Sequence, residues 1–194
     1  MRQLLLFILS FFISTGAAAQ KQTVLETLTP DYLQLQFAGK IGLISGGFGY
    51  HLFNEKVQLS LLNGYTPASI AGSPINTLAL RASYSICKVD LNKVHIVPYA
   101  GVGGNFETTG KAFYAKLPDR YADGYYFMSA AHATVFAGAR LQIPVGKKEG
   151  QRLELYGETG TLDTYLYYYC KNSHIRLTEI FSGALGVSWH FGNR

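Results

Sequence analysis

The sequence predicts an all-β protein: a transmembrane, antiparallel, up-and-down β-barrel of about eight strands that follows a cleaved signal peptide. Three observations lead to this prediction. The chain begins with an export signal, its remainder alternates apolar with polar residues in segments of roughly ten, and short links between these segments alternate with long ones. No stretch after the signal has 18 continuous apolar residues, so we expect no transmembrane helix.

Residues 1–19 have the features of a secretory signal peptide. Arg2 supplies a positive charge, residues 4–13 form an apolar core, and residues 17–19 are alanines suited to cleavage. The core is ten residues long, about half of the roughly 20 that a membrane-spanning helix needs, which disfavours a retained anchor. We expect cleavage after the alanines and a single barrel domain over residues 20–194.

Composition narrows the class of protein further. The chain has 17 Lys and Arg against 12 Asp and Glu, a formal net charge of +5, and the excess is spread without a basic run. We therefore expect no binding of nucleic acid. The 14 Tyr, 12 Phe and 21 Gly fit β-strands with aromatic girdles at a membrane interface, and they also fit a soluble β-sandwich.

Eight segments alternate with a period of two residues, as strands do when their two faces meet different surroundings. The last is the clearest, because Leu185, Val187 and Trp189 alternate with small or polar residues. The predicted strands are residues 32–38, about 41–52, 57–65, 76–86, 94–104, 134–143, 152–158 and 184–191.

The links between these strands favour a membrane barrel. The short links are residues 53–56, 87–93 and 144–150, and the long ones are residues 66–74, 107–131 and 161–180. Barrels with tight periplasmic turns and long outer loops alternate in this way. Two alternatives stay open: the first hairpin turns near Gly39 or near Gly46 and Gly47, and an extra hairpin within residues 161–180 would give ten strands.

Five charged residues fall on the polar face of the strands and are expected to point into the barrel lumen: Arg81, Arg140, Arg152, Glu154 and Glu158. An eight-stranded barrel has room for side chains but not for an open pore. Unpaired charges there would be costly, so we expect a hydrogen-bonded ionic network that fixes the strand register. The functional alternative is a proton acceptor at Glu154 or Glu158.

The C-terminal segment 184–191 resembles the signature of bacterial outer-membrane barrels, with Gly186 at its third position and aromatic Trp189 and Phe191 at its sixth and eighth. The resemblance implies recognition by the barrel-assembly machinery. The segment departs from the pattern in having Ala184 at its first position and three residues after the final aromatic.

The chain after the signal also resembles small, uncharacterised outer-membrane barrels of Bacteroidetes. The resemblance is carried by residues 42–50, 117–121 and 155–160. It implies a fold of about eight strands, a location in the cell outer membrane and contact with outer-membrane lipids. It implies no activity.

The long loops are the best candidates for function, because binding sites favour loops on rigid scaffolds. Loop 107–131 carries a set of tyrosines and charged residues: Tyr114, Lys116, Asp119, Arg120, Tyr121, Tyr125 and Tyr126. Tyrosines beside cations can contact glycans or lipid phosphates, so a surface ligand of unknown identity is one interpretation. The other is an aromatic girdle at the membrane interface.

Catalytic chemistry finds little support in the sequence. Outer-membrane lipid A deacylases of this size use a His-x-Ser motif, whereas Ser188 and His190 occur in the reverse order. We expect no catalytic, cofactor or metal site, and no disulfide between Cys87 and Cys170, which the predicted topology puts at opposite ends of the barrel.

We expect a non-enzymatic barrel with a structural or surface-binding role. The alternatives are an enzyme that modifies lipid A at the outer rim, and a soluble, lipocalin-like periplasmic binding protein. The soluble alternative predicts opposite faces for Trp189 and Leu141.

Overall fold

The computed structural model describes residues 29–109, 130–146, 149–172 and 174–192. Its strands are β1 (Tyr32–Ala38), β2 (Ile44–Leu52), β3 (Val57–Thr66), β4 (Ile75–Ser85), β5 (Val89–Leu91), β6 (Val94–Glu107), β7 (Ala131–Pro144), β8 (Gln151–Leu162) and β9 (Ser182–Phe191). Its helices are α3 (Ala68–Ala71), α4 (Asp163–Lys171) and α5 (Leu177–Ile180). No helix in the part of the chain that the structure describes is both long and apolar enough to cross a membrane.

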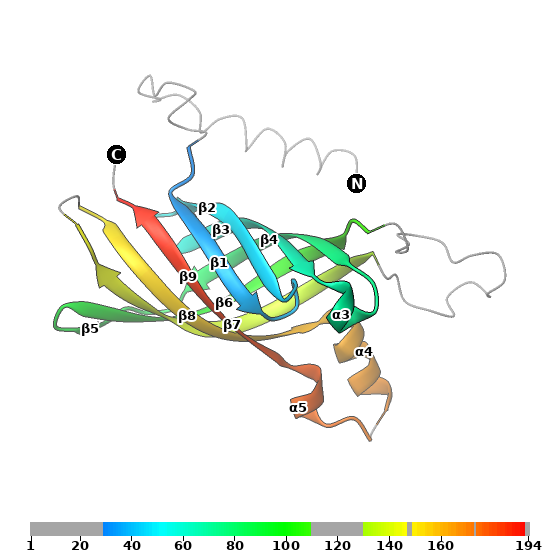
Figure 1. Ribbon diagram of the computed structural model, residues 1–194. Helices are drawn as coiled ribbons and strands as arrows, with labels where there is room; N and C mark the ends of the chain where they lie inside the picture. The colour runs from blue at the N-terminus through cyan, green and yellow to red at the C-terminus, as the bar shows by residue number, and fades with distance from the viewer. Residues whose placement is uncertain (1–28, 110–129, 147–148, 173, 193–194) are drawn as a thin grey trace, which may run out of the picture. The chain divides into compact units, whose positions relative to one another are not determined.

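Eight strands close into an antiparallel barrel (Figure 1). Sequential strands pair with each other, β4 pairs with β6, and β1 pairs with β9 to complete the circle. Closure leaves no free strand edge around the barrel wall, so almost all backbone groups of the wall are paired within it. The prediction of an all-β barrel of about eight antiparallel strands is confirmed.

The short strand β5 lies outside this circle. The chain leaves β4 at Ser85, passes through Ile86, and then pairs as β5 with the start of β6. Ile86 N donates a hydrogen bond to Pro98 O, which keeps the chain alongside β6. Asn92, at φ 55°, makes the tight turn. The predicted link 87–93 is therefore largely a projecting hairpin.

The first hairpin turns at Gly39. Ala38 and Gly39 have φ values of 61° and 93°, a left-handed region that favours glycine. The chain then turns inward, and Ile41 becomes buried with Leu62 and Ala79. Gly46 and Gly47 instead lie within β2, which decides the alternative that the sequence left open.

The link after β8 is helical, which corrects the prediction of a loop or an extra hairpin across residues 161–180. β8 continues to Leu162, and α4 and α5 follow. Asp163 in the first turn of α4 and Lys171 in its last turn complement the helix dipole. These helices lie at one end of the barrel, whereas the β5 hairpin lies at the other (Figure 1).

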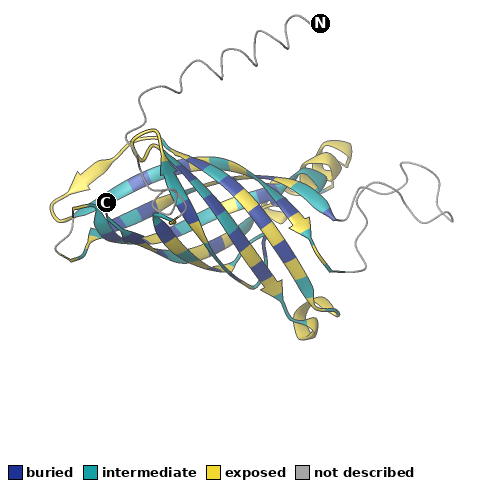
Figure 2. Ribbon diagram, turned by 90° about the horizontal axis from the view of Figure 1, so that it is seen from above, coloured by how far each residue is buried: buried dark blue, intermediate teal, exposed yellow. Residues whose placement is uncertain are grey.

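Buried and exposed residues alternate along the barrel strands (Figure 2). Large apolar side chains face outward, among them Leu35, Val102 and Leu185, which are 60%, 60% and 67% exposed. The inward side chains are mostly polar. Trp189 also faces outward, and Leu141 lies on the outer face of β7 between the buried Arg140 and Gln142.

Candidate functional site

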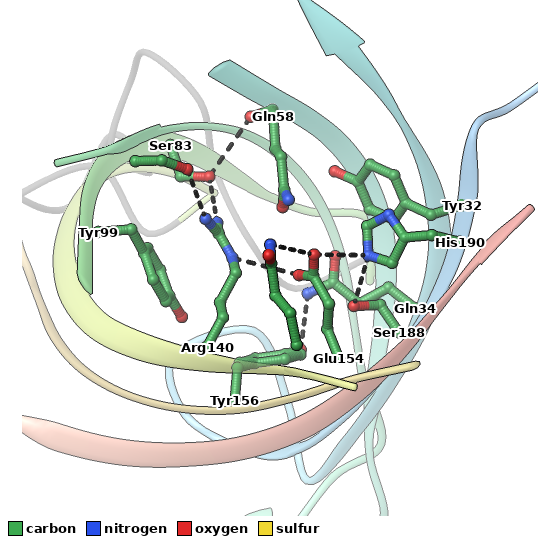
Figure 3. A network of polar contacts seen from close by, with 12 residues as sticks. Tyr32, Gln34, Gln58, Ser83, Tyr99, Arg140, Glu154, Tyr156, Ser188 and His190 are labelled. Carbon is green, nitrogen blue, oxygen red and sulfur yellow. Dashed lines mark hydrogen bonds and ion pairs between the residues drawn. The ribbon is translucent and has the colours of Figure 1, made fainter. Parts of the chain in front are cut away.

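The barrel lumen holds a group of buried polar and charged side chains. Five of them are the charged residues that the sequence placed on the polar face: Arg81 on β4, Arg140 on β7, and Arg152, Glu154 and Glu158 on β8. The even spacing of the three β8 residues puts them on one face of that strand. Figure 3 shows how side chains from several strands converge there.

Arg81 and Glu158 form an ion pair across the lumen. Arg81 Nη2 donates to both carboxylate oxygens of Glu158, at 2.7 and 2.8 Å. Gln36 Oε1 accepts a further hydrogen bond from Arg81 Nη1 at 3.0 Å, and Tyr99 Oη donates to Glu158 at 2.7 Å. The guanidinium also lies 3.7 Å from the centroid of the Phe136 ring. The pair therefore ties β4 to β8 and to β1.

Glu154 is the centre of a second group and is completely buried. Arg152 Nε and Gln142 Nε2 each donate to Glu154 Oε1 at 2.9 Å. Arg140 Nε lies 3.7 Å from the other carboxylate oxygen, and Arg140 Nη2 donates to Ser83 Oγ at 2.6 Å. Two guanidinium groups thus compensate one buried carboxylate, as a charge in a low-dielectric interior requires.

The second group continues to the end of the lumen where the short links lie. Arg152 Nη1 is 3.0 Å from a carboxylate oxygen of Glu55, which belongs to the turn between β2 and β3. With Glu55 included, three arginines face three glutamates, and Glu55 is the exposed member of this set.

A cluster of rings that the sequence pattern does not predict lies beside this network. Tyr32 stacks on His190 with 4.8 Å between ring centroids, and His51 Nε2 lies 2.8 Å from His190 Nδ1. His190 Nε2 lies 3.2 Å from Glu154 Oε1. The alternation of inward and outward residues along β1 and β9 indicates that Tyr32 and His190 face inward. Their proximity to His51 depends on closure of the barrel.

Ser188, His190 and Glu154 lie together but do not form a nucleophile relay. Ser188 Oγ and the Glu154 carboxylate both contact the same imidazole nitrogen, Nε2, at 3.3 and 3.2 Å. A relay needs the hydroxyl and the carboxylate on opposite nitrogens. All three side chains are also buried. The arrangement is therefore that of a hydrogen-bonded core.

The opposite end of the barrel carries a smaller polar group. His132 Nδ1 lies 3.2 Å from Asp163 Oδ1, and Thr164 Oγ1 lies 3.0 Å from the same nitrogen. Lys40 Nζ sits 4.0 Å from the centroid of the Tyr165 ring. Burial lowers the pKa of the Lys40 ammonium group. These contacts hold the start of α4 against β7 and against the first hairpin turn.

The residues of the proposed C-terminal signature lie on β9. Gly186 faces the lumen opposite Tyr156, while Trp189 faces outward and is 37% exposed. Phe191 is half-buried at the end of the strand.

The predicted surface-loop residues, Tyr114, Lys116, Asp119, Arg120, Tyr121, Tyr125 and Tyr126, lie outside the described residues.

The described part of the chain contains no group of three metal-ligating side chains. Cys87 and Cys170 are both exposed and free. Comparisons with protein-family models, with curated proteins and with solved structures found no match for this chain.

Proposed function

We propose that this chain is an integral protein of a bacterial outer membrane, exported through a cleaved signal peptide, with a structural or surface-binding role. The observation that carries the proposal is the inverted polarity of the barrel. Large apolar side chains cover the outside, and arginines, glutamates and glutamines fill the inside. A hydrocarbon solvent favours that distribution, and water opposes it.

The extent of the apolar exterior supports the same proposal. Outward-facing apolar residues more than 40% exposed occur on strands around the barrel: Leu33, Leu35, Phe37, Ile44, Leu80, Val102, Val135, Leu155 and Leu185. Soluble monomers rarely expose contiguous apolar patches larger than a few hundred Å². Contact with outer-membrane lipids would remove this surface from water.

A soluble lipocalin-like binding protein would need the opposite arrangement. Such a barrel holds its ligand in an interior lined mainly by apolar residues and keeps its exterior polar. Here the interior is occupied by charged and hydrogen-bonded side chains such as Arg81 and Glu154. The burial pattern therefore favours the membrane alternative over the soluble one.

An enzyme that modifies lipid A receives no comparable support. The described residues of the lumen provide no accessible nucleophile and base with relay geometry, since Ser188 and His190 are buried and share Nε2 with the carboxylate. We therefore propose a non-enzymatic role.

The same proposal assigns a partner during biogenesis. Gly186, Trp189 and Phe191 on the final strand would be recognised by the barrel-assembly machinery, in keeping with the resemblance of this segment to known signatures. The long links at the α4 end would then face the cell exterior and present any surface ligand site, because the termini of the barrel lie at the short-link end.

Electrophoretic mobility with and without boiling tests the proposal directly. The protein should fractionate with outer membranes, and the unboiled sample should migrate faster than the boiled one, because a closed barrel resists unfolding by detergent. A soluble periplasmic protein in the same preparation serves as the fractionation control. If the protein is recovered in the same soluble fraction as that control and its band does not shift on boiling, membrane insertion is refuted.

A further inference from the structure

Helix α4 leaves its aromatic side chains uncovered. Four of its nine residues are tyrosines, and none of the nine is buried. Tyr165, Tyr168 and Tyr169 are 41%, 43% and 38% exposed. Residues three and four positions apart are neighbours on a helix surface, so these three rings share one face of α4. We call this surface the tyrosine face.

Three cations lie on or beside the same helix. Lys40 Nζ lies 4.0 Å from the centroid of the Tyr165 ring, and Lys171 Nζ lies 5.9 Å from that of Tyr167. Arg176 is exposed on the connection between α4 and α5. In the described part of the chain, none of the three cations forms an ion pair with a carboxylate.

The two carboxylates of α4 and α5 are already engaged elsewhere. Asp163 Oδ1 lies 3.2 Å from His132 Nδ1, and the Asp163 carboxylate also accepts a hydrogen bond from Ala133 N. Glu179 Oε2 accepts a hydrogen bond from Arg176 N at 3.4 Å. The surface of the two helices therefore presents cations without ion-pair partners, and these favour an anionic ligand.

Exposed apolar side chains accompany the tyrosines along this part of the chain. Leu166 on α4, Leu177 on α5 and Phe181 before β9 are 36%, 55% and 40% exposed. A tyrosine has an apolar ring and a polar tip, and it concentrates where hydrocarbon meets headgroups. This combination suits the boundary of a lipid leaflet better than open water.

We propose that the tyrosine face, together with Lys171 and Arg176, binds the headgroup of an anionic glycolipid of the class of lipid A in the outer leaflet. The rings of Tyr168 and Tyr169 cover the apolar C–H groups of the sugar, and the two cations pair with its phosphates. Lys40, which a ring already holds, adds positive potential beside the site. The inference rests on the proposed function, because that function places the α4 end of the barrel in the outer leaflet.

Binding of diphosphorylated lipid A to the folded barrel in detergent, measured by native mass spectrometry, tests the ring contacts. Tyr168→Ala combined with Tyr169→Ala removes two rings but retains the helix, because alanine is the best helix former and α4 has no buried residue. This double variant should weaken binding about tenfold. Tyr84→Ala is the matched control, since Tyr84 is 52% exposed on β4 beside the β5 hairpin, at the other end of the barrel. It should bind like the wild type.

A second pair of variants tests the cations. Lys171→Gln combined with Arg176→Gln should weaken the binding of lipid A at least about tenfold, because each cation near an anionic lipid surface contributes to binding. Lys88→Gln combined with Lys93→Gln removes the same charge from exposed positions at the β5 hairpin and should bind like the wild type.

Two other lipids test the chemistry of the headgroup. Dephosphorylated lipid A lacks the anionic groups, and phosphatidylglycerol has a phosphate but no sugar ring. Each should bind the wild-type barrel at least about tenfold more weakly than diphosphorylated lipid A. Equal binding of phosphatidylglycerol would reveal attraction to charge alone and would overturn the assignment of a glycolipid.

Equal binding of lipid A by the wild type and by both double variants of the site would also overturn the inference. Fractionation of the same preparations separates this failure from that of the proposed function. A barrel that resides in the outer membrane but whose site variants bind lipid A normally overturns the headgroup site alone. A protein recovered in the soluble fraction overturns the proposed function.

Discussion

Gly186 on β9 leaves the space that the phenol of Tyr156 on β8 occupies. The two residues are directly paired, and a Cβ added at Gly186 would lie 2.2 Å from Cζ and Oη of Tyr156. The phenol donates a hydrogen bond to Gln36 Oε1 at 3.2 Å and accepts one from Gln34 Nε2 at 2.6 Å. A glycine of the proposed C-terminal signature therefore permits the packing of the lumen.

Replacing this glycine should destabilise the barrel. Gly186→Ala forces Tyr156 out of its position and should lower the free energy of unfolding by about 1–3 kcal/mol, the usual effect of overpacking. Urea unfolding of the refolded barrel in lipid vesicles measures the change. Gly183→Ala is the matched control on the same strand, because its Cβ meets no atom closer than 4.0 Å. Equal stability of the two variants would contradict the packing role.

The Arg81 and Glu158 pair should show strong coupling. Arg81→Met or Glu158→Gln alone leaves one buried charge without its partner and should cost about 3–5 kcal/mol of unfolding free energy. The double variant removes both charges and should cost clearly less than the sum of the two single changes. Urea unfolding of the four proteins completes the cycle. Additive effects would show that the pair does not act as a unit.

The filled lumen should block ion flow. Arg81 and Glu158 span the interior, and Arg140 with Glu154 occupies the adjoining layer. The wild-type protein in a planar lipid bilayer should therefore give no stepwise conductance, as expected for a barrel whose interior just accommodates side chains. Discrete channel openings from pure, folded protein would contradict the structure of the lumen.

The inward turn of the first hairpin should contribute to stability. Ile41 is 5% exposed and packs with Leu62 and Ala79, so Ile41→Ala should cost about 2–5 kcal/mol. Leu35→Ala, on the outward face of β1, should cost less, because lipid or detergent fills the vacated space around a side chain that is 60% exposed. Unfolding in vesicles compares the two. A larger loss from Leu35→Ala would contradict the burial of Ile41.

Several residues of the site are predictable from the sequence, because the alternation of side chains between the two faces of a strand depends only on neighbouring residues. Alternation by itself puts Arg81, Arg140 and Glu154 on the polar face, since successive side chains of a strand point to opposite sides. Gln36 follows the same alternation on β1, so the sequence pattern predicts that it faces inward. Its hydrogen bond to Arg81 is not predictable in this way, because 45 residues separate the two in the chain.

The helical link after β8 shows where local reasoning fails. Residues 163–171 are rich in tyrosine, a weak helix former, and the preceding strand pattern favoured a loop. In the structure the helix is held at its start by Asp163, which contacts His132 on β7 and accepts a hydrogen bond from Ala133 N. Those contacts exist only once β7 and β8 are paired.

The sequence by itself determined the positions of the eight barrel strands and which face of each strand points inward, because period-two alternation acts over a few neighbours in the chain. Tertiary structure alone decided which lumenal charges pair, how the chain after Gly39 enters the barrel, and how far β9 extends beyond its last pair with β1. These features depend on closure, since the register between the first and last strands is set by packing around the whole circumference of the barrel.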